Sequence, residues 1–405
     1  MMSCSSIVLI APSRVYPPLA GGHQRTLATA QGLARAGYKV TVLCLAGRKP
    51  DYVHREGEKS YCFQELEERL VQIVDLGLRQ GLAQSLMRHL GYSKLWSYLL
   101  WPLLKKSKVC KETLEQADIF ILDSPFIASS TLPKKPLIVL SHNLEAELCL
   151  AGDFVERTFL LPLVKRVEQS TAEKASAVLS CAPSDTQFYE AINPKVVELA
   201  NGMQKQTTSL EQDNKSRELL GFDEDLLLLF VGSRYEPNRI AAERLRSYTE
   251  QREAFLSKHR IRFVIAGSVF AESFSSEVLT ITGPVEDMKP YLSCADLAIN
   301  AVTTGSGSNV KNFEALAAGL PVLSTRFGAR GLDEQLANTL SYFSSFEDID
   351  HHLENLVGQR EFLKRKGTEL LQQYSQHILM DQMVERNAVP LIESLIEKDS
   401  LRSSL

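Results

Sequence analysis

Short apolar runs alternate along the first half of the chain with stretches whose apolar residues recur at helical spacing. Five runs have the length of buried strands, at residues 6–12, 39–45, 119–123, 137–141 and 176–182. Residues 23–37 and 154–174 are the clearest helical stretches between them. Continuous apolar strands that alternate with helices predict a parallel sheet covered on both faces.

The same pattern begins again after a polar stretch at residues 203–219. We therefore predict an α/β fold of two doubly wound, Rossmann-like domains that face each other across a cleft, at residues 1–200 and 201–380. Sheets of this kind bind ligands beyond the carboxyl ends of their strands, so the cleft is the expected site. The expected strands of the second series are 226–232, 261–267, 297–300 and 320–325, with helices from about 238, from about 286 and at 309–318.

Composition limits the function classes. The chain has 405 residues, of which 44% are hydrophobic and 23% charged, with a net charge of −4, so broad nucleic-acid binding is not expected. Its seven scattered cysteines form no C-x-x-C pair, which argues against a disulfide scaffold or a zinc site. No apolar stretch reaches the roughly 18 residues of a spanning helix. We expect a cytoplasmic enzyme without a metal site.

The segment Gly305-Ser306-Gly307-Ser308 joins a predicted strand to a predicted helix. Ser308 is a good N-cap, and the glycines let a ligand approach the free N–H groups at the helix start, where anions bind. Lys311 lies in the first turn, where a cation opposes the helix dipole. A phosphate or diphosphate would remove this conflict, because it accepts hydrogen bonds from both the amides and the ammonium.

Three further residues of the second series are binding candidates. Glu314 shares a helix face with Lys311, and a carboxylate there can bind a diol such as the ribose hydroxyls. The alternative is a surface Lys–Glu pair worth about 0.5 kcal/mol or less. Arg234 follows strand 226–232, and its guanidinium fork suits phosphate. Val285 follows a Gly-Pro turn, where backbone groups can meet a flat base.

In the first domain, Gly21 and Gly22 precede a helix, and His142 ends a predicted strand. The two glycines are either an ordinary tight turn or a place where a phosphate or sugar approaches the backbone; they do not form G-x-G-x-x-G. His142 lies at the carboxyl end of a strand, where α/β domains place their catalytic residues. A hydrogen-bonded structural histidine is an equally good interpretation. His23 and Arg25 either face the cleft or are solvated.

These residues lie in motifs that resemble the GT-B fold retaining glycosyltransferases of the family 4 type, the glycosyl transferases group 1. The matching pieces occur in the family's order across nearly the whole chain. They are GGHQRTLATAQGLARAGYKVTVL, SHNLEAE, ELANGM, FVGSRYEPN, VIAG, TGPVEDMKPYLSCADLAI and GSGSNVKNFEALAAGLPVLST.

The resemblance implies a metal-independent transfer of a sugar from a nucleotide-diphosphate sugar, held mainly by the second domain. It implies that Glu314 binds the donor ribose and that Lys311 and Arg234 neutralise the diphosphate. By the same resemblance, Val285 meets the base, and His142 lies near the transferred sugar. Gly21 and Gly22 match a loop that closes on the donor, and the Gly305–Ser308 loop lies beside the diphosphate. The helical segment 381–405 is expected to pack back on the first domain.

The sequence departs from the family pattern at two positions. The first of two glutamates that the family usually carries falls at Ser306, which affects recognition of the sugar. A common lysine falls at Asn238, and Lys311 is our candidate to supply the missing charge. Two rival functions stay open, a nucleotide-sugar epimerase of the same fold and a non-catalytic nucleotide-sugar binding protein.

The acceptor is expected to be a glycan or a lipid-linked molecule in the synthesis of cell-surface polysaccharide or glycolipid. Residues 85–108 contain both tryptophans, many leucines and six basic side chains, counting one histidine. Such a segment can lie in a membrane interface, which would make the enzyme peripheral on the inner membrane face. The alternative is a helical pair packed on its own domain.

Overall fold

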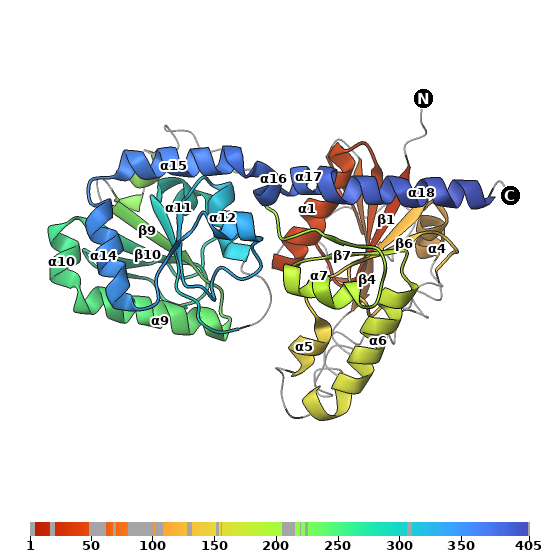
Figure 1. The fold of residues 1–405 in the computed structure, drawn as a ribbon, viewed down its shortest axis with the longest axis horizontal. Coiled ribbons are helices and arrows are strands. Elements are labelled where there is room, and N and C mark those ends of the chain that lie inside the picture. The colour runs from red at the N-terminus through yellow and green to blue at the C-terminus, as the bar shows by residue number, and fades with distance from the viewer. Residues whose placement is uncertain are drawn as a thin grey trace. The chain divides into compact units, whose positions relative to one another are not determined.

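The computed structural model divides the chain into two compact units (Figure 1). Unit 1 comprises Met1–Gly202 and Met380–Leu405, and unit 2 comprises Met203–Leu379. The structure describes residues 5–16, 21–47, 62–67, 70–79, 97, 101, 108–127, 132–150, 154, 156–204, 215–218, 220–222, 226–305 and 310–403.

Unit 1 contains an 8-stranded sheet in the order β3-β4-β2-β1-β5-β6-β7-β8. All neighbouring strands are parallel except the β3–β4 pair. The order reverses between β1 and β5, so loops diverge there at the carboxyl ends of the strands. The strands are β1 (Ser6–Ala11), β2 (Lys39–Gly47), β3 (Cys62–Leu66), β4 (Val71–Arg79), β5 (Ile119–Leu122), β6 (Leu137–Leu140), β7 (Ala177–Ser180) and β8 (Val196–Glu198).

The helices of unit 1 include three segments from the C-terminal end of the chain. Gly32 of α1 and Gly202 lie against this end, and a Cβ on Gly202 would be 2.6 Å from Met383 Sδ. Only glycine at position 202 allows this close packing. The helices are α1 (Gly21–Arg35), α4 (Lys108–Glu115), α5 (Glu145–Leu150), the π-helix η3 (Glu156–Leu160), α6 (Leu161–Lys174), α7 (Pro183–Glu190), α17 (Met380–Met383), the π-helix η4 (Val384–Ala388) and α18 (Val389–Ser403).

Unit 2 contains a 7-stranded sheet in the order β11-β12-β10-β9-β13-β14-β15. Only the β11–β12 pair is antiparallel, and the order reverses between β9 and β13. Its long strands are mostly apolar and buried, as the sequence predicts, with Arg262 and Asn300 as the polar exceptions. The strands are β9 (Leu226–Val231), β10 (Ile261–Ala266), β11 (Phe274–Ser275), β12 (Leu279–Ile281), β13 (Leu297–Asn300), β14 (Val322–Ser324) and β15 (Ser341–Tyr342).

Helices cover the unit 2 sheet, with α9 and α15 on opposite sides of β9 and β10 (Figure 1). The helix expected from about residue 286 begins at Lys289, where Pro290 occupies the first turn and fixes a helical φ. The helices are α9 (Glu236–Gln251), α10 (Glu253–Lys258), α11 (Lys289–Cys294), α12 (Val310–Ala317), α13 (Glu334–Ala337), α14 (Phe346–Leu356), α15 (Arg360–Gln373) and α16 (Ser375–Ile378).

The predicted α/β fold with two Rossmann-like units is thus confirmed. Of the expected interfacial segment 85–108, the structure describes only Ser97, Trp101 and Lys108. Trp101 is fully buried in the apolar core of unit 1, so this side chain is not available to a membrane. The remainder of the segment lies outside the described residues. Within the described ranges, no helix has the length and apolar character needed to cross a bilayer.

Candidate functional site

The loops after β9 and β13 of unit 2 approach each other at the point where the strand order reverses. Gly305, in the loop after β13, has a φ of +121°. A Cβ on Gly305 would lie 3.1 Å from Pro237 Cγ and 3.2 Å from Tyr235 Oη, both in or beside the first turn of α9. Only glycine combines this backbone conformation with so close an approach. The ligand position expected for such a sheet lies here.

Lys311 lies in the first turn of α12 beside this loop. Its ammonium donates a hydrogen bond to Asn238 Oδ1 across 2.6 Å, and Nζ is 5.4 Å from the centroid of the Phe230 ring. The pKa of Lys311 is lowered to about 8, mainly by burial and also by the positive charge of Arg330, while the Glu314 carboxylate opposes the shift. The site therefore holds a partly desolvated cation that an anion would stabilise.

Glu314 lies one turn further along α12 and is partly buried. Burial raises the pKa of its carboxyl group, and the nearby Lys311 charge opposes this shift. In the described part of unit 2, the Lys311 ammonium bonds to Asn238 and makes no hydrogen bond to Glu314. The pair therefore differs from the exposed surface pair that was the alternative.

The other predicted residues of unit 2 occupy loops at the same edge of the sheet. Arg234 is exposed in the loop between β9 and α9, and Val285 is partly buried in the loop after β12. Both loops follow strands whose carboxyl ends point to the Lys311 side, because β9, β10 and β12 are parallel. Ser306, Gly307 and Ser308 lie outside the described residues.

A buried amide network fixes the start of α12, and sequence reasoning did not find it. Asn300 Nδ2 donates to Asn312 Oδ1 at 2.9 Å and to the Gly328 carbonyl at 3.1 Å, and Asn312 Nδ2 donates to the same carbonyl at 2.8 Å. A Cβ on Gly328 would lie 2.7 Å from Ser324 Oγ, so glycine is needed there. The network joins β13, α12 and the loop after β14.

Arg330, in that same loop, is a second residue that sequence reasoning missed. Its guanidinium stacks on the Phe327 ring at 4.1 Å from the centroid. Burial lowers the pKa of Arg330, and its charge acts on Lys311, so the two cations lie close together. The signal in the sequence was an arginine between glycines, Gly328-Ala329-Arg330-Gly331, directly after a strand.

In unit 1, Asp123 follows β5 and His142 follows β6. His142 Nε2 lies 2.6 Å from Asp123 Oδ1, and the Thr26 hydroxyl donates to the same oxygen across 2.7 Å. Gly22 lies in the first turn of α1, and a Cβ added there would be 3.8 Å from His142 Nδ1. The structure thus brings His142 and Gly22 together, beside Gly21, at the carboxyl end of the sheet.

His23 and Arg25, also in α1, differ in their surroundings. His23 Nε2 pairs with Ser13 Oγ at 3.2 Å, and burial lowers the pKa of His23, with Asp123 raising it and His142 lowering it. Arg25 is buried and donates to the carbonyls of Ser141 and Leu199 at 2.6 Å each. Arg25 therefore neither is solvated nor faces a cleft; it joins the ends of β6 and β8.

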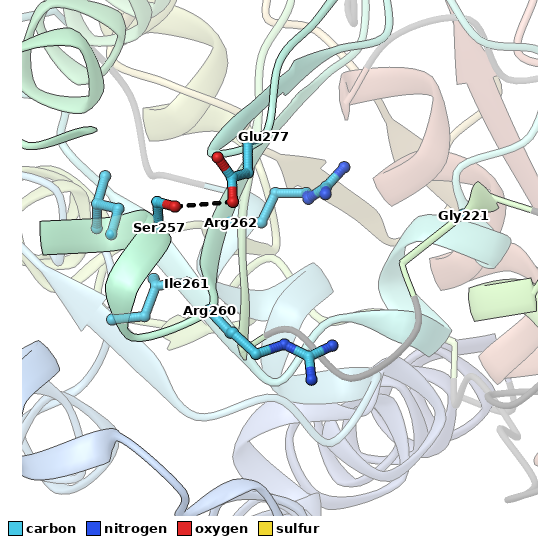
Figure 2. Close-up of a pocket in the computed structure, with 7 residues that line it drawn as sticks. Gly221, Ser257, Arg260, Ile261, Arg262 and Glu277 are labelled. Carbon is cyan, nitrogen blue, oxygen red and sulfur yellow. Dashed lines mark hydrogen bonds between the residues drawn. The ribbon is translucent and has the colours of Figure 1, made fainter. Parts of the chain in front are cut away.

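A cavity of about 280 Å³ opens at the amino end of β10. Figure 2 draws the residues that line it. Arg260 and Arg262 line one part of it, and Ser257 donates to Glu277 across 2.7 Å at another. The predicted site residues lie at the carboxyl ends of the strands and do not line this cavity. In the ranges that the structure describes, no three His, Cys, Asp or Glu side chains form a group that could hold a metal ion.

Comparisons with known proteins fit this architecture. Residues 225–349 match the sequence profile of the family glycosyl transferases group 1. The chain is similar to sucrose-phosphate synthase from Thermosynechococcus elongatus, at 13% identity and a TM-score of 0.65 over 99% of this chain and 100% of that one. A comparison with curated proteins gave no match.

Two further solved structures are similar to the chain. WaaG, a glycosyltransferase involved in lipopolysaccharide biosynthesis, is 16% identical, with a TM-score of 0.57 over 97% of this chain and 98% of that one. HepE of Anabaena, in complex with UDP-glucose, is 13% identical, with a TM-score of 0.55 over 99% of this chain and 100% of that one. At such identities the likeness shows the fold alone. The chain therefore has the GT-B fold, and its residues 225–349 match the glycosyl transferases group 1.

Proposed function

We propose that this protein is a glycosyltransferase that takes a sugar from a nucleotide-diphosphate donor. The observation that carries the proposal is the partly buried Lys311 ammonium, held by Asn238 at 2.6 Å where the unit 2 strand order reverses. This place lies within the segment that matches the glycosyl transferases group 1. A diphosphate would balance the positive charge of this ammonium.

In this proposal, unit 2 binds the nucleotide. Lys311 and Arg234, with the N–H groups at the start of α12, take the two phosphates, in line with the preference of helix N-termini for anions. Glu314 accepts hydrogen bonds from the ribose hydroxyls, and backbone groups of Val285 meet the base. The Gly305–Ser308 segment lies beside the diphosphate.

Unit 1 supplies His142 and the Gly21-Gly22 helix start to the transferred sugar. In the transfer, the bond between the anomeric carbon and the diphosphate oxygen breaks, and a bond to the acceptor oxygen forms. The departing diphosphate keeps the bonding electron pair, and the proton of the acceptor hydroxyl passes to one of its oxygens. Positioned cations and amides stabilise the negative charge that develops. Attack from the same face as the leaving group would retain the anomeric configuration.

The finer features belong to the same proposal. HepE was solved with UDP-glucose, which makes uridine diphosphate the first nucleotide to test. We propose a glycan or lipid-linked acceptor, in cell-surface polysaccharide or glycolipid synthesis, and transfer without a metal ion. Because Ser306 occupies the place of a family glutamate, we expect sugar selectivity to differ from that of relatives that carry the acid.

The test has a binding step and a turnover step. A thermal-shift screen against uridine, guanosine and adenosine diphosphates should give a raised melting temperature with one of them, because a ligand of the native state stabilises it by mass action. Donor sugars of that base are then incubated with and without an acceptor panel. No stabilisation by any of the three nucleotides would contradict the proposal.

The turnover step separates the rival functions. A changed sugar in the absence of acceptor would identify an epimerase. Nucleotide binding without hydrolysis or transfer would favour a non-catalytic binding protein. A His142→Ala variant whose turnover stays within about threefold of the wild type, a difference of only about 0.6 kcal/mol, would remove His142 from the mechanism.

A further inference from the structure

Asp123 is held in place by three contacts at the carboxyl end of the unit 1 sheet. Its backbone N–H donates to the Ile10 carbonyl at 3.0 Å, which fixes the turn after β5. Its Oδ1 lies 2.7 Å from the Thr26 hydroxyl on α1 and 2.6 Å from His142 Nε2 after β6. The side chains of Asp123 and His142 are 9% and 17% exposed. The carboxylate therefore has a fixed position inside the site.

The contact to His142 determines which ring nitrogen carries the proton. An ionised carboxylate only accepts hydrogen bonds, so the 2.6 Å contact requires a proton on Nε2. In the neutral ring, Nδ1 then has a lone pair and accepts. A fixed carboxylate that sets the tautomer of a histidine is a recurring device in catalytic sites.

The acceptor nitrogen lies beside Gly22 in the first turn of α1. A Cβ on Gly22 would lie 3.8 Å from His142 Nδ1, and Gly22 itself is exposed. Within the described part of unit 1, no hydrogen bond to Nδ1 is present. The missing side chain at position 22 leaves room for a hydroxyl group in front of this nitrogen.

The other charged groups around the pair do not compete for the carboxylate. Burial lowers the pKa of His23, which favours the neutral form of this neighbour, and its Nε2 pairs with Ser13 Oγ. The Arg25 guanidinium is committed to the carbonyls of Ser141 and Leu199. His142 is thus the only histidine or arginine among the described residues that donates to Asp123.

We propose that Asp123 is a positioning residue, which holds His142 in the Nε2–H tautomer so that Nδ1 accepts a hydrogen bond from a hydroxyl of the transferred sugar. The role toward the sugar rests on the proposed function, whereas the tautomer is a property of the protein itself. The resemblance to the family assigned no role to Asp123.

The full chain labelled with ¹⁵N-histidine tests the tautomer by NMR. The sequence has eight histidines, and a His142→Gln variant identifies the signal of His142. We expect a protonated Nε2 and an unprotonated Nδ1 in the wild type. Asp123→Asn should shift the equilibrium toward the Nδ1–H form, because the amide can donate to Nε2. A wild-type ring protonated on Nδ1 would overturn the proposal.

Kinetics of the same variants test the consequence. We expect Asp123→Asn to lower kcat about 100-fold and to leave KM for the donor within about twofold, because the orientation of His142 acts on the reacting sugar. Asp118→Asn is the matched control: this exposed carboxylate lies at the other end of β5, where it accepts from the Ser6 N–H. It should change neither the tautomer nor kcat.

The two arms separate the failure of this inference from that of the proposed function. An unchanged tautomer in Asp123→Asn together with a kcat within about threefold of the wild type would overturn the role of Asp123. A wild-type chain that binds no nucleotide and transfers no sugar would overturn the proposed function and the kinetic role, while the NMR arm alone would still decide the tautomer.

Discussion

The Lys311 ammonium and the Asn238 side-chain oxygen are 2.6 Å apart, across 73 positions of sequence. Asn238 is buried, and its Nδ2 group donates to Ser233 Oγ at 3.1 Å, so its oxygen is turned toward Lys311. The resemblance placed a common family lysine at position 238. The structure puts the Lys311 charge beside that position, which supports the proposal that Lys311 supplies it.

Replacement of Lys311 tests this charge directly. Lys311→Ala should weaken binding of the preferred nucleoside diphosphate about tenfold or more, because a hydrogen bond to a charged group contributes about 1.5–3 kcal/mol. Isothermal titration calorimetry measures the effect. Lys289→Ala, at an exposed position in α11, serves as the control and should bind normally. Unchanged affinity in Lys311→Ala would remove Lys311 from the site.

Nucleotide affinity should fall as pH rises through the pKa of Lys311. Burial lowers this pKa to about 8 in the free protein, and only the protonated form attracts the diphosphate. Between pH 7 and pH 9 we expect up to about tenfold weaker binding, following the loss of the charged form. Lys311→Arg, which stays charged, should bind with little dependence on pH over this range.

The lowered pKa of Lys311 has the opposite consequence for the free energy of unfolding, which should increase with pH. The folded pKa lies below the unfolded value, so between about pH 8 and pH 10.5 the unfolded chain binds more protons at this residue. Lys311 therefore contributes a stability that increases with pH across that window. Denaturant unfolding of the wild type and of Lys311→Met at pH 8 and pH 10 measures this contribution of Lys311 to the free energy of unfolding. An equal pH dependence in both proteins would contradict the assignment.

Replacement of Glu314 should weaken only those nucleotides that carry the ribose 2′- and 3′-hydroxyls. We expect Glu314→Gln to weaken binding of the preferred ribonucleotide about tenfold, since a charge-assisted hydrogen bond becomes a neutral one. The 2′,3′-dideoxy analogue lacks the partner hydroxyls, so the same substitution should leave its affinity nearly unchanged. Glu286→Gln, exposed near Val285, is the control. Equal losses for both nucleotides would argue against a ribose contact.

Arg330 should contribute to diphosphate binding, although no sequence motif identified it. Its charge lowers the pKa of Lys311, so we expect the same charge to attract a diphosphate bound at Lys311. Arg330→Gln should weaken the nucleoside diphosphate several-fold and the nucleoside alone hardly at all. The matched control is Arg326→Gln in the same loop, whose exposed guanidinium stacks on Tyr342 at 4.0 Å from the ring centroid. If Arg330→Gln and Arg326→Gln bind the nucleoside diphosphate equally well, Arg330 does not contribute to diphosphate binding.

A buried ion pair of unit 2 should be costly to break. Arg217 Nη2 donates to Asp296 Oδ1 at 2.7 Å, and the Leu227 N–H donates to the other oxygen at 2.9 Å. Asp296→Asn leaves a buried guanidinium without its counter-charge, which typically costs about 3–5 kcal/mol. A fall of about 6–20 °C in the melting temperature of unit 2 follows. The exposed pair Arg246–Glu250 offers the contrast, because Glu250→Gln should change stability by no more than about 0.5 kcal/mol.

The local pattern of apolar residues sufficed to predict the fold, but it did not reveal the strands at and next to the sheet edges. The apolar runs at 6–12, 119–123 and 226–232 became β1, β5 and β9, because a buried parallel strand needs an uninterrupted apolar sequence. The strands that were not expected are β3, β4, β8, β11, β12 and β15. Each is an edge strand or the neighbour of one, and in such positions a strand needs no uninterrupted apolar run.

The sequence alone determined the alternation of strands and helices, and with it the strand ends and helix starts at which His142, Arg234, Lys311 and Glu314 lie. It could do so because secondary structure and capping depend on neighbours within a few residues. Only the tertiary structure decided that Lys311 meets Asn238, that the Arg330 charge acts on Lys311 and that Asp123 holds His142. These relationships join residues from different strand ends, and sheet order, which no local pattern encodes, sets their distances.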